Sequence, residues 1–215
     1  MSWTLYSQMQ LYGDFLSCDY KVKTFDLLQE IKQFDNLWQK YNPYKPEIKR
    51  DALAVTSFDG TNDPINFGSL KDITKATGKN LIEEDFKHFT TVYDNSPILQ
   101  DMLKCWKPWL NRTQFIRLPQ GGHFPPHVDG GTKVCPTSFR IVFPLQNVNP
   151  PDFCWMYGDD QKYFPLQWEL GRMYYLNTNK RHWLFNASSI DSIWLVCNIT
   201  TCEESVIEWR KRTAK

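Results

Sequence analysis

Eight short apolar or alternating segments, separated by Gly, Pro, Asn and Asp, follow one another from Thr113 onward. The segments are QFIRL, HFPPHV, SFRIVFPL, FCWMY, YFPLQW, RMYYL, RHWLF and SIWLVCNIT. Strands this short, at regular spacing and with no helical segments between them, are typical of a sandwich or small barrel and not of βαβ units. The sequence therefore predicts a jelly-roll-like β-structure over residues 111–202.

The first half of the chain has a different pattern, which predicts mainly helices. Residues 24–40 place apolar side chains on one helical face, and the pattern stops before an Asn-Pro pair. A second helix is expected over 96–109, where a Ser-Pro pair suits the cap and the first helical position. A strand is expected over 52–58, closed by an Asp-Gly pair, and a short helix near 82–89.

Together these patterns predict an α+β fold without an internal repeat or an independent second domain. With 215 residues, of which 41% are hydrophobic, the chain is long enough to bury one substantial core. We expect a single domain over 1–215, in which a helical half over 1–110 packs against the β core over 111–202 and offers a possible lid. Residues 203–215 are expected to form a C-terminal tail.

Charge and cysteine usage narrow the class of partner and the compartment. The formal net charge is only +1 and the longest basic run is Arg-Lys-Arg at 210–212, so we expect no nucleic-acid partner. The sequence shows neither a signal-peptide pattern nor a bilayer-spanning segment, so no membrane association is expected. Six cysteines without CxxC spacing suit reduced thiols. These features predict a cytoplasmic protein and leave its oligomeric state open.

Three residues in the predicted strands stand out as possible metal ligands. His127 and Asp129 are two positions apart, so in a strand both side chains project from the same face. In the segment RHWLFN, the same alternation places His182, Leu184 and Asn186 toward the interior. Two imidazoles and one carboxylate can cover one face of an octahedral metal ion and leave the other open, which is the ligand set of non-haem Fe(II) oxygenases. The set of His127, Asp129 and His182 therefore predicts a metal centre for oxidation chemistry.

Simpler interpretations compete for each of these residues. An isolated histidine is more often a hydrogen-bonded, partly buried imidazole than a ligand, and Asp129 could be a turn residue before a Gly-Gly pair. His123 and His127 would share a helical face, but two consecutive prolines between them exclude a helix, and the HExxH zinc motif is absent. We interpret His123 as a rim or substrate-side residue and not as a ligand, and His88 as a structural residue.

Three segments of the second half carry a resemblance to a known family. They are FIRLPQGGHFPPHVD at 115–129, SFRIVFPL at 138–145 and GRMYYLNTNKRHWLFN at 171–186. These segments resemble the Fe(II)/2-oxoglutarate-dependent oxygenases, most of all the aspartyl/asparaginyl β-hydroxylase-like and prolyl-hydroxylase-like branch. The resemblance covers roughly residues 111–200 and implies a double-stranded β-helix, the cupin-like form of the jelly roll. It also implies Fe(II) held by His127, Asp129 and His182, with 2-oxoglutarate and O2 as cosubstrates.

Arg140 matches the arginine that the family places in the strand after the first ligands. A planar guanidinium can meet the distal carboxylate of 2-oxoglutarate with two parallel hydrogen bonds, so the resemblance implies this role for Arg140. The alternative is a salt bridge at a strand edge. For the same role, many relatives carry an Arg or Lys about ten residues after the histidine that matches His182. This chain has Asp-Ser-Ile-Trp there, at 191–194. Lys133 is the weaker candidate for the same role.

The resemblance implies hydroxylation of an amino acid, a peptide residue or a related small metabolite. Animal-type aspartyl/asparaginyl β-hydroxylases lack the metal carboxylate that Asp129 supplies here, so their substrate does not carry over. One alternative is a cupin-like metal enzyme that does not use 2-oxoglutarate and has no need of Arg140. The other is a non-catalytic jelly-roll binding module, against which the intact triad argues. Aromatic residues could line the cavity, although alternation turns about half of them away; they are Trp155, Tyr157, Tyr174 and Tyr175.

Overall fold

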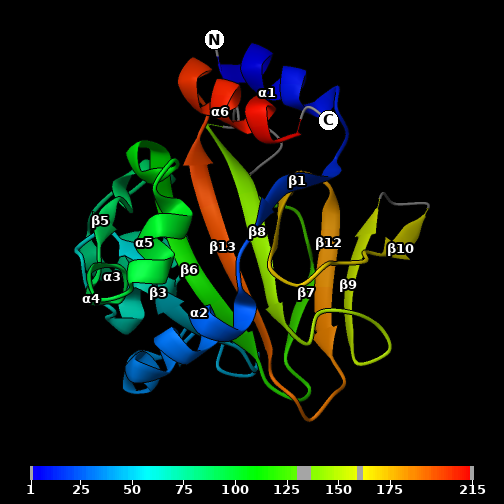
Figure 1. Ribbon diagram of the computed structural model, residues 1–215. Helices are drawn as coiled ribbons and strands as arrows, with labels where there is room; N and C mark the ends of the chain where they lie inside the picture. Colours follow the sequence, from blue (N-terminus) through cyan, green and yellow to red (C-terminus); the bar gives the residue numbers. More distant parts are fainter. Residues whose placement is uncertain (1, 130–136, 159–161, 214–215) are drawn as a thin grey trace.

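The second half of the chain folds into the eight strands that the sequence predicts (Figure 1). These strands are β6 (Leu110–Leu118), β7 (His123–His127), β8 (Ser138–Gln146), β9 (Phe153–Gly158), β10 (Tyr163–Pro165), β11 (Arg172–Leu176), β12 (Arg181–Asn186) and β13 (Ser192–Thr200). The computed structural model describes residues 2–129, 137–158 and 162–213. Because polar turn residues separate the strands, each one reverses direction and pairs antiparallel with its neighbours.

Two sheets share these strands. The core of the larger sheet runs β11-β8-β13-β6, and the smaller sheet runs β10-β9-β12-β7. Apolar side chains from both sheets pack into one cluster, because every second residue of a strand points to the same face. The cluster includes Ile116, Val142 and Trp194 from the larger sheet and Phe153 and Trp155 from the smaller. Two sheets packed face to face in this chain order form the expected double-stranded β-helix.

The first half of the chain mixes helices with strands, so the prediction of a mainly helical half over 1–110 is not confirmed. Its strands are β1 (Phe15–Lys21), β2 (Gln39–Lys40), β3 (Asp51–Ala54), β4 (Thr56–Ser57) and β5 (His88–Phe89). β1 pairs with β11, whereas β3 pairs with β6 and carries β2, so the larger sheet has seven strands. The small strands β4 and β5 pair with each other.

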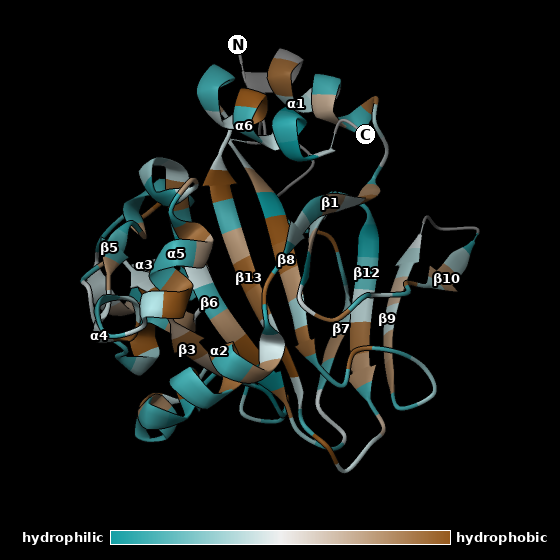
Figure 2. Ribbon diagram, viewed as in Figure 1, coloured by the Kyte–Doolittle hydropathy of each residue, from teal (hydrophilic) through white to brown (hydrophobic). Residues whose placement is uncertain are grey.

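The helices of the first half are the α-helices α1 (Ser2–Gln10), α2 (Thr24–Ile31), α3 (Leu70–Thr77), α4 (Thr91–Asp94) and α5 (Pro97–Leu103), and the 3₁₀ helices η1 (Lys32–Leu37), η2 (Pro64–Phe67), η3 (Glu83–Asp85) and η4 (Lys107–Trp109). Several of them, including α2 and α5, cover the outer face of the larger sheet. Leu27 and Leu99 from these helices pack with Phe143 and Leu195 of the sheet in a second apolar cluster. Figure 2 shows the apolar colouring along β8 and β13, which lie between the two clusters.

Several expected elements are shorter than their sequence patterns. The helix expected over 24–40 ends at Ile31 and continues as η1, where Phe34 has non-helical backbone angles of −106° and 18°. Its buried face contains Leu27 and Ile31, whereas the apolar side chain of Phe25 in the first turn is 70% exposed. The expected helices over 96–109 and 82–89 also divide, the first into α5 and η4 and the second into η3 and β5.

Residues 203–215 were expected to form a tail, but most of them form a helix. This helix, α6 (Glu203–Thr213), packs beside α1 over one end of the sheets (Figure 1). Its Trp209 is fully buried and meets the ring of Tyr175 edge to face, with the ring centroids 5.5 Å apart. A buried tryptophan of this size ties α6 to the β core.

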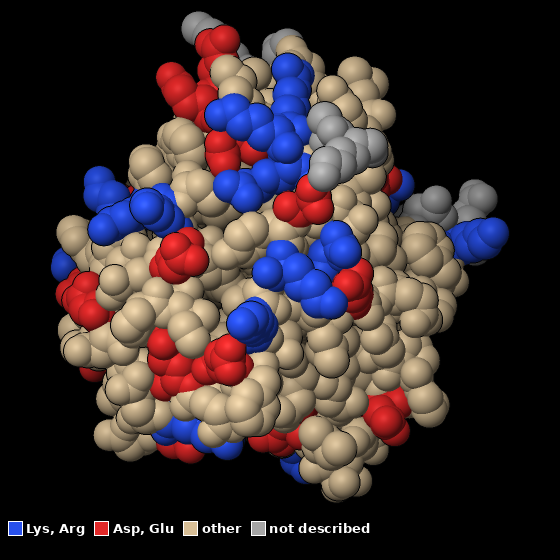
Figure 3. Space-filling view, in the orientation of Figure 1, with Lys and Arg blue, Asp and Glu red and all other residues tan. Residues whose placement is uncertain are grey.

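The surface in Figure 3 carries basic and acidic side chains side by side. Among the described residues, no helix is both long enough and apolar enough to cross a membrane. The five cysteines in the described ranges are free thiols, and Cys135 lies outside those ranges.

Candidate metal centre

Two adjacent strands bring the two histidines of the predicted triad together. His127 ends β7 and His182 lies near the start of β12, and the antiparallel register makes them direct partners. Their ring centroids are 4.3 Å apart. Because His182, Leu184 and Asn186 are buried while Arg181 and Phe185 are exposed, β12 has the expected inward face.

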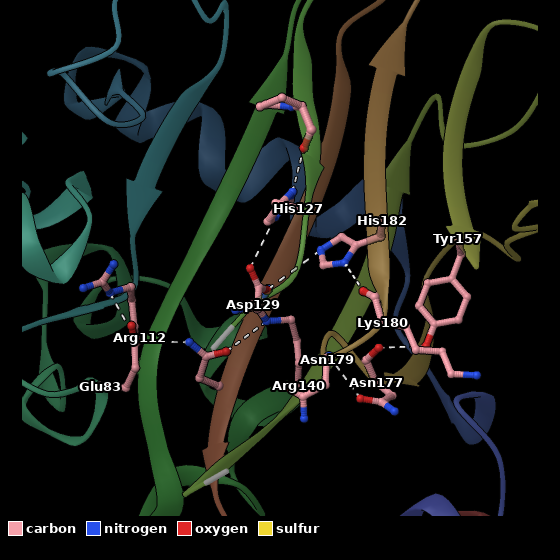
Figure 4. Close-up of polar contacts among 12 residues, drawn as sticks. Glu83, Arg112, His127, Asp129, Arg140, Tyr157, Asn177, Asn179, Lys180 and His182 are labelled. Carbon is pink, nitrogen blue, oxygen red and sulfur yellow. Dashed lines mark hydrogen bonds and ion pairs between the residues drawn. The ribbon is translucent and has the colours of Figure 1, made fainter. Parts of the chain in front are cut away.

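Asp129 completes the triad from the turn after β7 (Figure 4). Its backbone N–H donates to the carbonyl of Thr178 at 2.9 Å, which fixes the turn against the chain before β12. The carboxylate lies 3.2 Å from Nε2 of His127 and 3.9 Å from Nε2 of His182. One donor atom from each residue lies within 4.8 Å of the others. The three side chains are therefore close enough to share one ion.

Backbone carbonyls set which nitrogen of each imidazole carries a proton. Nδ1 of His127 lies 2.7 Å from the carbonyl oxygen of Pro125, and Nδ1 of His182 lies 2.9 Å from that of Lys180. A carbonyl can only accept, so each Nδ1 must donate and each neutral ring keeps its lone pair on Nε2. Metal-binding histidines are commonly oriented in this way. The donor set thus fits a divalent metal, with both free lone pairs on the side of Asp129.

The surroundings hold His182 and Asp129 in the protonation states that a metal requires. His182 is 1% exposed, and burial lowers the pKa of its imidazole to about 4, even though Asp129 favours the charged form. Burial alone would raise the pKa of the Asp129 carboxyl, but the charge of Arg140 and the neighbouring histidines together lower it below its usual range. At neutral pH the site therefore presents a neutral His182 and an ionised Asp129.

Arg140 projects from β8 directly onto the triad. Its Nη1 donates to Oδ2 of Asp129, and its Nε donates to Oδ1 of Asn198 at 3.0 Å. The guanidinium therefore contacts a candidate ligand and does not form a salt bridge away from the site. Lys133, the weaker candidate for the same role, lies outside the described residues.

Sequence reasoning missed a polar chain that continues from Arg140. Asn198 donates from Nδ2 to Oε2 of Glu83 at 3.2 Å, and the same oxygen lies 3.4 Å from Nε of Arg112 (Figure 4). We call Arg140, Asn198, Glu83 and Arg112 the polar chain. Strand alternation could have indicated two of its members, because Arg112 shares a face with Gln114, and Asn198 shares one with Val196. No local pattern indicated Glu83, which belongs to η3.

The triad and the polar chain line one cavity of about 540 Å³. Its apolar wall includes Trp155, whose ring lies 6.1 Å from that of His182 at an interplanar angle of 21°. Of the four aromatic candidates, Trp155 lines the cavity, whereas Tyr157, Tyr174 and Tyr175 are buried in the apolar clusters. The cavity is large enough for more than one small molecule beside the triad.

The other two histidines stay outside the group. His123 lies at the opposite end of β7, where it pairs with Phe185. His88 is an exposed residue of β5. Among the described residues, the metal-compatible group consists of His127, Asp129 and His182 alone.

Comparisons with known proteins find similarity at the level of the fold. No family model and no curated protein matches the sequence. The structure is similar to a prolyl-4-hydroxylase from Pseudomonas putida, with a TM-score of 0.51 and 12% identity over 94% of this chain and 100% of that chain. It is also similar to a non-heme alpha-ketoglutarate-dependent carbocyclase from nogalamycin biosynthesis, with a TM-score of 0.53 and 6% identity over 90% and 81% of the two chains. The chain thus shares its architecture with both enzymes.

Proposed function

We propose that the protein is an Fe(II)- and 2-oxoglutarate-dependent oxygenase that hydroxylates an amino acid, a peptide residue or a related small metabolite. The observation that carries this proposal is the convergence of His127, Asp129 and His182, within 4.8 Å of one another, at the wall of a cavity of about 540 Å³. The shared fold and the two arginines in the cavity support it.

His127, Asp129 and His182 would hold the iron through two imidazoles and one carboxylate. Bound iron, together with 2-oxoglutarate and O2, supplies the oxidising power for hydroxylation of a C–H bond. The chain itself contributes both imidazoles in the tautomer that a metal needs, because backbone carbonyls hold the proton of each neutral ring on Nδ1. Three protein ligands leave the remaining positions of an octahedral ion free for exchange.

Arg140 is the proposed partner for the distal carboxylate of 2-oxoglutarate. Its guanidinium lines the same cavity as the triad, so a molecule bound to it would extend toward the metal position. The apolar wall, which includes Trp155, Leu184 and Val196, would keep water from the reacting carbon and orient the substrate.

The decisive experiment measures succinate formed from 2-oxoglutarate by the Fe(II)-loaded protein under O2, for example by NMR. Candidate amino acids and peptides are added in turn, and a mass increase of 16 Da on one of them identifies the substrate class. His127→Ala serves as the inactive control. If iron is demonstrably bound and no succinate forms with or without a substrate, the proposal is wrong.

One observation favours a second candidate, a cupin-like metal enzyme that does not use 2-oxoglutarate. The guanidinium of Arg140 is already bound to Asp129 and Asn198, which occupies the proposed cosubstrate contact. In such an enzyme an Arg140→Ala variant would retain full turnover, whereas an oxoglutarate-dependent enzyme would lose most of it.

A non-catalytic binding module would show no Fe(II) or Mn(II) binding by calorimetry.

A further inference from the structure

Arg112 is a second guanidinium in the cavity, and its neighbours hold it on three sides. Nη1 donates to the carbonyl of Gly68 at 3.2 Å, and Nε lies 3.4 Å from Oε2 of Glu83. The guanidinium carbon lies 3.8 Å from the centroid of the Phe86 ring, within the range of a cation–π contact. These contacts fix the orientation of the guanidinium before any ligand arrives.

The guanidinium of Arg112 has N–H donors that no described residue accepts. The Arg112 side chain is 10% exposed, and its Nη2 is buried without a hydrogen-bond partner among the described residues. The acidic neighbour is shared, because Oε2 of Glu83 also accepts from Asn198. A buried guanidinium donor without an acceptor costs free energy, and arginine has no acceptor of its own with which to compensate. The arrangement indicates that an acceptor belonging to a ligand completes it.

We propose that Arg112 binds a carboxylate of a small organic acid inside the cavity, as a second cation beside Arg140. A planar, preoriented fork suits a carboxylate, which accepts two parallel hydrogen bonds. The carboxylate belongs to the molecule that is oxidised, because Arg140 is the proposed partner of 2-oxoglutarate. This inference deepens the proposed function by adding a recognition residue to the same cavity.

The test measures carboxylate binding without turnover. Protein loaded with Mn(II) in the absence of O2 is titrated by calorimetry with 2-oxoglutarate and with pyruvate, which has the oxo acid end but no distal carboxylate. Protein loaded with Mn(II) and 2-oxoglutarate is then titrated with N-acetyl amino acids and with their amides. Arg112→Gln is compared with Arg117→Gln, which removes an arginine of the same strand that pairs with Asp51 and does not line the cavity.

If Arg112 binds the substrate, Arg112→Gln leaves the binding of 2-oxoglutarate and pyruvate unchanged and removes the preference for acids over amides. If the variant instead weakens 2-oxoglutarate binding at least tenfold and leaves pyruvate binding unchanged, Arg112 serves the cosubstrate and the inference is wrong. Wild-type affinity for every probe in a folded Arg112→Gln protein would overturn the inference.

A second variant separates ligand recognition from a structural role, because Arg112 also holds the loop at Gly68. Glu83→Gln removes the negative charge that competes for Arg112 while keeping a side chain of the same size. We expect carboxylate binding to tighten severalfold in Glu83→Gln. Weaker binding in Arg112→Gln together with unchanged binding in Glu83→Gln would mark Arg112 as structural and overturn the inference.

These outcomes are independent of catalysis. If carboxylates bind in an Arg112-dependent manner but no succinate forms with Fe(II) bound, the oxygenase proposal fails and the recognition role stands. If succinate forms at the wild-type rate and every probe binds normally in Arg112→Gln, the recognition role fails and the oxygenase proposal stands.

Discussion

The guanidinium of Arg140 donates to the carboxylate of Asp129, so the acidic member of the candidate metal centre has a cationic partner within the protein. A carboxylate has two oxygens and can serve a metal with one and an arginine with the other. The pair therefore links the candidate metal position to the side of the cavity where we propose that a carboxylate binds.

Replacing Arg140 by Gln is expected to separate metal binding from cosubstrate binding. The three ligands remain in Arg140→Gln, so we expect the Kd for Mn(II) to change by less than about tenfold, or about 1.4 kcal/mol. Loss of the charged fork should weaken 2-oxoglutarate binding by more than that factor. Calorimetry with each ligand in turn checks both values. Equal weakening of metal and 2-oxoglutarate would show that Arg140 mainly orients Asp129.

Removal of one ligand should abolish stabilisation by metal. His127 ends β7 with a partly exposed side chain, so His127→Ala should fold while losing one of three ligands. We expect Mn(II) to raise the melting temperature of the wild-type protein and to leave that of His127→Ala unchanged. The matched control is His123→Ala, at the other end of the same strand. An equal metal-induced shift in all three proteins would rule out a site at His127.

Acid should destabilise the metal-free protein through His182. Its folded-state pKa of about 4 lies below the ordinary value of 6.5, so the unfolded chain takes up the proton first as the pH falls. The contribution of the neutral, buried His182 to the free energy of unfolding is fully present above pH 6.5. It is lost as the pH falls from that value to about 4. At about 1.4 kcal/mol per pKa unit the loss amounts to a few kcal/mol. Urea unfolding at several pH values should show a shallower dependence in His182→Gln, and identical slopes would contradict the assignment.

Asn186 should be a strong determinant of stability. It is fully buried, and its amide donates to the carbonyls of Leu118 and Ile190, both at 2.8 Å. Its oxygen accepts from Asn147 Nδ2 and from the backbone N–H of Ser188, both at 3.1 Å. Because Asn186→Ala leaves several buried groups unpaired, we expect a loss of about 2–4 kcal/mol in the free energy of unfolding. A urea titration that gives less than about 1 kcal/mol would contradict this expectation.

Local pattern was sufficient for the strands of the β core and for the inward face of β12. Each of the eight strands has apolar positions bounded by turn residues, and the alternation around His182 correctly placed Leu184 and Asn186 inside. These features depend on neighbours in the sequence, which a single chain displays directly. Asp129 was expected in one strand with His127, but β7 ends at His127, and the two histidines meet through the pairing of β7 with β12.

Long-range pairing explains what the sequence did not reveal. β1 has only Cys18 buried, so it lacks the alternation that marks a strand and is defined by its pairing with β11. Glu83 reaches Arg112 and Asn198 only because the fold brings η3 to β6 and β13. Such contacts follow from the tertiary structure and leave no periodic signal.

The pairing of β1 with β11 and of β3 with β6 also determines how the chain can be divided. A fragment starting at residue 111 would lack β1 and β3. It would leave β11 and β6, the outer strands of the core of the larger sheet, with rows of unpaired N–H and C=O groups. Such open edges recruit strands from other molecules, so this fragment should self-associate although it contains all three candidate ligands. The segment before residue 111 thus covers the edges of the larger sheet and prevents self-association. We therefore expect that soluble expression of the candidate metal centre requires this segment.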